Sequence, residues 1–109
     1  MKNLNFDLLD DNGYPTDDLL DFIERFDYRD GWIKLMDIIY DCWFGPSYFS
    51  KTEENGYMVY DLSTGGWSGN EDLIAALQSN HMFWAMNWYS SRRGGHYEFK
   101  VKLYENQFE

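Results

Sequence analysis

The sequence predicts an α+β fold, an antiparallel sheet of about four strands with three helices packed on it, in the order α-α-β-β-α-β-β. Apolar residues recur at helical spacing in three segments, 16–27, 32–44 and 71–79. Asn55-Gly56 separates two segments rich in aromatic and β-branched residues, which is typical of a β-hairpin. A second pair of strand-like segments, 81–90 and 96–104, flanks a glycine-containing loop. A length of 109 residues predicts a single domain, 1–109.

The first part of the chain predicts an irregular arm followed by two helices. Asn12-Gly13 and Pro15 indicate turns, so we expect residues 1–15 to be irregular. Thr16 is a suitable N-cap for the first helix, since two aspartates follow it in the first turn. The second helix begins after Gly31 and has a wide apolar face, which predicts that it is the more buried of the two.

The middle of the chain predicts a hairpin and then a glycine-rich loop that leads into a helix. Segments 48–52 and 57–62 are the predicted strands of the hairpin. The loop covers 63–72 and contains three glycines around Trp67. Ser68 or Asn70 is expected to cap the helix that follows, which makes it the best capped of the three.

The last two predicted strands differ in their patterns. Segment 81–90 is apolar on both faces, which predicts a central or covered strand. Its alternating Met82, Trp84, Met86 and Trp88 are expected to pack in the core, with a binding surface as the alternative. Segment 96–104 alternates cleanly between apolar and polar residues, so one of its faces is expected to be in water.

Negative charge is concentrated at the front of the sequence. The formal net charge is −10, and residues 1–41 hold eleven acids and four bases, a net −7. This composition argues against direct nucleic-acid binding and favours a basic surface of another protein as the partner. The candidate partner-binding residues lie along the first helix: Asp17, Asp18, Asp21, Glu24 and Asp27. The alternative is a solvated helix face that serves solubility alone.

A second hypothesis is a small-anion or nucleotide-binding module. The 65–70 loop runs into a helix N-terminus, where backbone N–H groups and the helix dipole favour anions. A cluster of positive residues lies beside another glycine pair in the 91–95 loop. If the two loops converge, the binding residues would be Gly66, Trp67, Ser68, Asn70, Arg92, Arg93 and His96. The spacing matches neither a P-loop nor a dinucleotide fingerprint, so no cofactor is expected.

The sequence does not indicate an enzyme. His96 with Ser68, Glu71 or Asp72 would supply acid–base groups, but no spacing enforces such a set. Two histidines and one cysteine provide no recognisable metal site, and Cys42 is expected to be a small buried apolar residue. No apolar run approaches a membrane span and none resembles a signal peptide, so we expect a cytoplasmic protein.

Three short stretches carry a resemblance. Residues 64–72 (TGGWSGNED), 82–84 (MFW) and 92–97 (RRGGHY) resemble a pattern in small uncharacterised proteins of bacteria and their phages. The resemblance covers about residues 60–102 and carries no activity. It implies a phage or mobile-element setting inside a bacterial host cell. Small acidic proteins from such a setting are often inhibitors of host proteins, and a plain structural or immunity-type partner is the remaining alternative.

Overall fold

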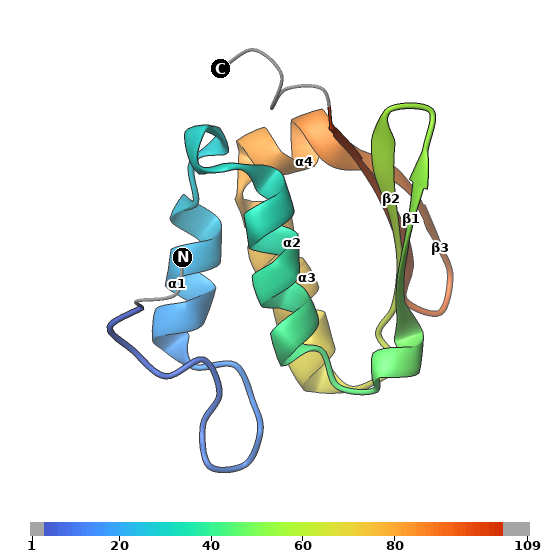
Figure 1. The fold of residues 1–109 in the computed structure, drawn as a ribbon. Helices are drawn as coiled ribbons and strands as arrows, with labels where there is room; N and C mark the ends of the chain where they lie inside the picture. Colours follow the sequence, from blue (N-terminus) through green and yellow to red (C-terminus); the bar gives the residue numbers. More distant parts are fainter. Residues whose placement is uncertain (1–3, 104–109) are drawn as a thin grey trace.

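The computed structural model describes residues 4–103 and confirms the predicted α+β class (Figure 1). Over these residues the chain forms one antiparallel four-stranded sheet and four α-helices, one more helix than predicted. The helices are α1 (Asp17–Arg25), α2 (Trp32–Cys42), α3 (Ser68–Ser79) and α4 (His81–Asn87), and two short 3₁₀ segments are η1 (Tyr28–Asp30) and η2 (Pro46–Tyr48). The strands are β1 (Phe49–Glu54), β2 (Tyr57–Ser63), β3 (Trp88–Arg92) and β4 (His96–Lys102).

The sheet has the strand order β1-β2-β4-β3, and every neighbouring pair is antiparallel. The predicted hairpin is confirmed, because Asn55 and Gly56 form its two-residue turn with φ of 53° and 84°. Two positive φ values in succession match the right-handed twist of the flanking strands, and this is why Asn-Gly is favoured there. Tyr104, the last residue of the predicted 96–104 strand, lies outside the described residues, as do residues 1–3 of the predicted arm.

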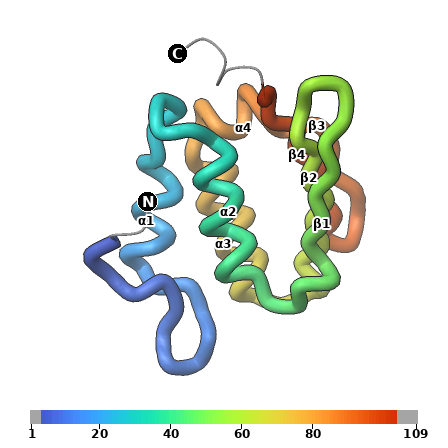
Figure 2. Tube along the Cα trace, viewed as in Figure 1, coloured from blue at the N-terminus to red at the C-terminus, as the bar shows by residue number. Residues whose placement is uncertain are grey.

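The helices form two layers on one side of the sheet. α2 and α3 lie side by side against the sheet, and α1 packs on α3 at the side away from the strands (Figures 1 and 2). We expected all three predicted helices on the sheet, whereas α1 covers other helices instead. The core between these layers is apolar, and its largest fully buried side chains include Tyr60, Phe83, Phe99, Leu19, Ile23, Leu35, Met36, Ile39, Leu73 and Leu77.

Local signals explain where α1 and α2 begin. The Thr16 hydroxyl accepts a hydrogen bond from the Leu19 N–H at 3.1 Å, which confirms the predicted N-cap. α2 begins directly after Gly31, whose φ of 94° is a backbone conformation that glycine adopts without strain. As predicted, α2 is the more buried helix, because six of its eleven residues are buried against two of nine in α1.

The prediction of a strand over 81–90 is wrong for most of that segment. Residues 81–87 form α4. Strand β3 begins only at Trp88 and lies at an edge of the sheet. Phe83 and Asn87 are the buried positions, spaced by one helical turn, whereas Met82, Met86 and Trp88 are 43–52% exposed. The alternation of large residues therefore does not reflect strand pleating. Trp84 packs against the core as predicted, with its ring 5.5 Å from that of Phe99, whereas the other three residues of the stripe lie at the surface. The signal for a helix was Asn80, which caps α4 by accepting from the Phe83 N–H at 3.0 Å.

The predicted cap of α3 is also wrong. Trp67 occupies the N-cap position and makes no side-chain capping hydrogen bond, while Ser68 and Asn70 lie inside the first turn of the helix. Asn70 is instead fully buried and bonds to other loops. Among residues 4–103, no helix is long and apolar enough to cross a membrane.

Candidate functional site

The predicted acidic face lies on the outer layer of the molecule. Asp17, Asp18, Asp21 and Glu24 are exposed on α1, and Asp27 follows the helix as the N-cap of η1. Residues 17–30 carry six carboxylates and two guanidinium groups, a net charge of −4. Because α1 is the helix farthest from the sheet, this charge is presented to solvent on one side of the molecule (Figure 1).

Two arginines pair with this face without neutralising it. Arg25 Nε donates to Asp21 Oδ1 at 3.0 Å, and Arg29 Nη2 donates to Asp27 Oδ2 at 2.7 Å. Hydrogen bonds from the Arg29 side chain and backbone lower the pKa of Asp27 to about 2, so this carboxylate stays ionised even at mildly acidic pH. Both pairs are mostly exposed, and exposed pairs exchange partners at little cost in free energy.

The acidic face surrounds a hollow of about 370 Å³ with an aromatic floor. Phe6 packs on Phe22 with ring centroids 5.7 Å apart, and Phe22 packs edge-on against Phe26 at 5.5 Å. The charged side chains that line the hollow are Asp18, Asp21, Arg25, Asp27 and Asp30. Apolar rings beneath carboxylates are suited to a long cationic side chain, whose methylene stem needs apolar contact and whose head needs negative charge.

A smaller hollow of about 210 Å³ adjoins this one and shares Arg25, Phe26 and Asp27 with it. Tyr28 and Met82 line it and are each 52% exposed. Large exposed apolar side chains beside charge are typical anchors of protein interfaces. The sequence alone places Met82 in a strand and gives Phe6 as one of the apolar residues that could tie the N-terminal arm to the core, so neither is predicted to line this surface.

The two loops of the alternative anion site do meet. The Thr64 N–H donates to the Gly95 carbonyl at 3.0 Å, and Ser63 Oγ is hydrogen-bonded to His96 Nδ1. Gly95 has a φ of 80°, and a Cβ at this position would collide with the Thr64 hydroxyl. Gly95 is therefore explained by the close approach of the two loops, whereas its neighbour Gly94 is explained by its own positive φ of 87°.

Two of the predicted ligand-binding residues, Trp67 and Asn70, make packing contacts and hydrogen bonds within the protein. The Trp67 ring lies between Phe44, at a centroid distance of 4.7 Å, and Tyr14, at 4.8 Å. Asn70 accepts from the Phe44 N–H and donates to the Phe44 carbonyl, both at 2.9 Å, and it also donates to the Thr64 carbonyl. These contacts make the 65–70 loop a packing corner that joins the α2–β1 connection to the start of α3.

The remaining residues of that site lie at its surface. Gly66, Ser68, Arg92 and Arg93 are exposed, and His96 is half-buried. The Glu71 carboxylate accepts a hydrogen bond from the Thr64 hydroxyl at 3.3 Å, which adds a negative charge at the start of α3. Anion binding at these loops stays a prediction.

The single cysteine of the chain lies in unreactive surroundings. Cys42 is buried, and its burial raises the pKa of the thiol to about 11, so the thiol is neutral at physiological pH. Within the described part of the chain, no group of three or more His, Cys, Asp or Glu residues is arranged to hold a metal ion.

No protein-family model, curated protein sequence or solved structure matches the chain. The resemblance of residues 64–72, 82–84 and 92–97 to small bacterial and phage proteins therefore stays a prediction. The function has to be argued from the chemistry of the surface.

Proposed function

We propose that this protein is a non-enzymatic binding protein whose acidic face occupies a basic surface of another protein. The observation that carries the proposal is the hollow between α1 and η1, where three phenylalanines lie beneath aspartates. Phe26 belongs to the core and Phe6 and Phe22 pack against it, and the hollow leaves part of this apolar surface open beside the carboxylates. The hollow suits insertion of a lysine or arginine side chain of the partner.

The energetics of such an interface divide between its centre and its rim. A cation over the Phe22 or Phe26 ring gains a cation–π attraction that strengthens as water is displaced. Tyr28 and Met82 add apolar contact area beside the charged centre. The outer carboxylates, Asp17 and Glu24 among them, contribute mainly to the rate of encounter, because exposed charges steer a basic partner over long distances.

We further propose that the basic surface of the partner is one that binds nucleic acid. A row of carboxylates along a helix presents negative charge at short intervals, as a nucleic-acid backbone does. The protein would then compete for a basic nucleic-acid-binding surface of a bacterial host protein. The resemblance to phage and bacterial proteins supports the role of a phage-encoded inhibitor acting in the host cytoplasm.

A charge-reversal pair of variants tests the acidic face. The test variant carries Asp17→Lys, Asp18→Lys, Asp21→Lys and Glu24→Lys. The matched control carries Glu53→Lys, Glu54→Lys, Asp61→Lys and Asp72→Lys, four exposed acids outside this face. Both variants change the net charge equally, so a difference in partner capture from host lysate reports on position. We expect the test variant to lose capture and the control to keep it, with circular dichroism confirming that both are folded.

The captured partner then allows two measurements that would refute the proposal. Affinity should fall steeply as salt rises, since the attraction is screened within a Debye length of about 8 Å at physiological ionic strength. A DNA or RNA oligonucleotide should displace the protein from its partner. Equal loss of capture in both variants would contradict the assignment to α1, and failure of any oligonucleotide to compete would contradict the nucleic-acid-binding surface.

A further inference from the structure

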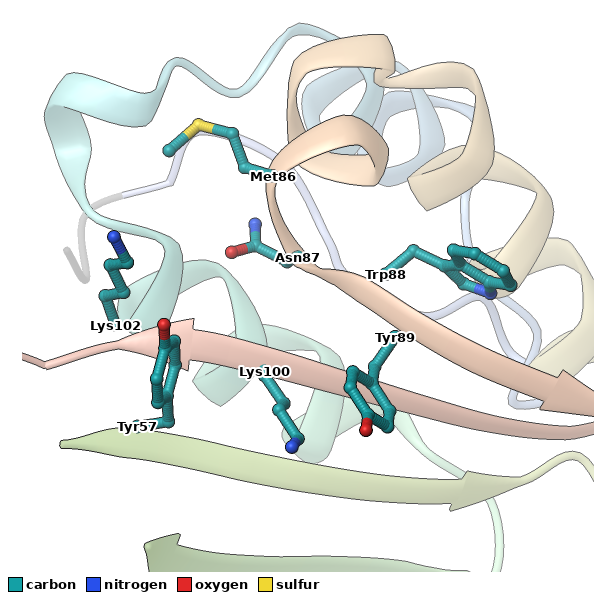
Figure 3. Close-up of a pocket in the computed structure, with 7 residues that line it drawn as sticks. All are labelled: Tyr57, Met86, Asn87, Trp88, Tyr89, Lys100 and Lys102. Atoms are coloured by element: carbon teal, nitrogen blue, oxygen red, sulfur yellow. The ribbon is translucent and has the colours of Figure 1, made fainter. Parts of the chain in front are cut away.

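A third hollow, of about 500 Å³, lies where α4 passes into β3, on the side of the molecule away from α1 (Figures 1 and 3). Its lining comes from the end of α4, the start of β3 and the ends of β2 and β4: Tyr57, Met86, Asn87, Trp88, Tyr89, Lys100 and Lys102. Of these residues, the sequence suggests only Met86 and Trp88, as part of an alternative binding surface. The register explains the convergence, because Tyr57 lies opposite Lys102 and the bulge of β3 falls at Tyr89.

Asn87 gives this hollow a buried donor that has no partner. The side chain is 4% exposed, and its Nδ2 makes no hydrogen bond to the described protein. Figure 3 shows the amide turned toward the space between Met86, Tyr57 and Lys102, while Trp88 points the opposite way. Buried polar groups in native proteins are nearly always hydrogen-bonded, so an unpaired donor facing a cavity indicates that an acceptor from outside completes it.

The charge of the hollow is opposite to that of the protein as a whole. Among residues 4–103, Lys100 and Lys102 line it and no carboxylate does, although the net charge of the chain is −10. Lys100 Nζ lies 3.9 Å from the centre of the Tyr89 ring, an arrangement that holds the ammonium group at the wall of the hollow. The charged and amide donors therefore select an anionic, acceptor-rich ligand.

Aromatic rings flank the cationic group. Figure 3 shows Tyr57 and Tyr89 on either side of Lys100, and Met86 closes the opposite side of the space. Tyr89 is 56% exposed and Met86 is 46% exposed, so neither is needed to fill the core. Rings and a thioether at the wall of a polar hollow favour a flat, unsaturated group stacked between them.

We propose that this hollow binds a small anion that carries a planar ring joined to a phosphate or a carboxylate. Lys100 attracts the anionic group, the Asn87 amide donates to an acceptor on the ligand, and Tyr57 and Tyr89 contact the ring. A nucleoside monophosphate and an aromatic carboxylate share this chemistry. A long polyanion is disfavoured, because the rest of the surface would repel a nucleic-acid backbone.

Calorimetric titration tests the site with adenosine monophosphate and 4-hydroxybenzoate as the two anionic probes. Adenosine and inorganic phosphate test the ring and the charge separately, and a ten-residue thymidine oligonucleotide tests the polymer. We expect saturable 1:1 binding of at least one anionic probe, with adenosine and phosphate each at least ten-fold weaker. The probe that binds more tightly identifies whether phosphate or carboxylate is the preferred group.

Three variants locate the binding. Lys100→Gln and Asn87→Leu should each weaken it at least ten-fold, whereas Arg93→Gln should leave it unchanged. Arg93→Gln removes one positive charge from the other end of the β3–β4 hairpin, within the alternative anion site, and so is the matched control for Lys100→Gln. Circular dichroism checks Asn87→Leu, and the half-buried Lys100 supplies a variant outside the core.

Several outcomes would overturn the proposal. These are no saturable binding of either anionic probe, phosphate binding as tight as that of the ring-bearing anion, tighter binding of the oligonucleotide, or an equal loss in Arg93→Gln. Because the hollow and the acidic face lie on different sides of the molecule, Lys100→Gln should still capture the protein partner. Failure of this site is therefore distinguishable from failure of the acidic interface.

Discussion

The two ends of α4 each hold a buried asparagine, and the two side chains behave differently. Asn80 and Asn87 are both 4% exposed. At the N-terminal end, Asn80 accepts from the Phe83 N–H and donates to the carbonyls of Ile23 and Phe26, each at 2.9 Å. At the C-terminal end, the Nδ2 of Asn87 has no partner among the described residues. Asn80 therefore fastens α1 to α4, whereas Asn87 offers a donor to a hollow.

This difference shows that burial of a polar side chain does not by itself reveal its role. A satisfied amide in the interior stabilises one packing arrangement, because breaking it leaves several backbone groups without partners. An unsatisfied amide costs free energy in the folded protein and is retained where recognition needs it. Substitutions at these positions should therefore change the free energy of unfolding in opposite directions.

The largest change in the free energy of unfolding is expected at Asn80, the fully hydrogen-bonded asparagine before α4. Asn80→Ala removes the cap of α4 and leaves the Ile23 and Phe26 carbonyls buried without a donor, so we expect a loss of about 3 kcal/mol or more. Urea denaturation followed by circular dichroism measures the change. A loss below about 1 kcal/mol would show that water replaces the amide and would remove the contrast between the two ends.

A smaller loss is expected at the second satisfied asparagine. Asn70→Ala breaks the bonds to Phe44 and Thr64, and at least one of these groups lies close enough to the surface for water to replace it, so we expect about 2 kcal/mol. Thermal denaturation gives the measurement. Ser68→Ala is the control, since Ser68 is exposed and makes no capping bond, and a comparable loss there would mean that the loop as a whole is fragile.

At Asn87, the asparagine without a hydrogen-bond partner for its Nδ2 in the described part of the chain, we expect a substitution to raise the free energy of unfolding. Asn87→Leu replaces an unpaired buried amide by an apolar side chain of similar size, which should raise the free energy of unfolding by about 1 kcal/mol. The same variant should lose ligand binding, so stability and binding would move in opposite directions. A clear destabilisation in urea denaturation would indicate that Asn87 makes an essential structural contact.

The smallest change in the free energy of unfolding is expected at a second buried polar group without a partner in the described structure, the hydroxyl of Tyr60. The Tyr60 hydroxyl is buried and has no hydrogen-bond partner within residues 4–103, and burial together with the nearby Asp37 carboxylate raises the pKa of the phenol above its ordinary value. Tyr60→Phe removes only this oxygen, so we expect a gain of about 0.5 kcal/mol. Differential scanning calorimetry detects such a change, and a loss of more than about 1 kcal/mol would reveal a bound water or ligand at the hydroxyl.

Local signals in the sequence were sufficient for much of the fold. Thr16 placed the start of α1, and Asn55-Gly56 placed the first hairpin, because each depends on residues within a few positions of itself. The α+β class followed from the order of these segments. The segment 81–90 failed because large apolar residues at alternate positions suit both a strand and a short helix with exposed residues, and contacts with distant segments decided between them.

For the candidate sites too, some features follow from single residues of the sequence and others only from the tertiary structure. The sequence by itself determined that α1 is acidic and that two glycine-rich loops exist, since charge and glycine content belong to single residues. Only the tertiary structure decided that Phe6 and Phe22 line the same hollow as the aspartates, that the 65–70 loop is a packing corner, and that Asn87, Lys100 and Tyr57 line one hollow. These groups are far apart along the chain, and the strand register and the helix layers bring them together.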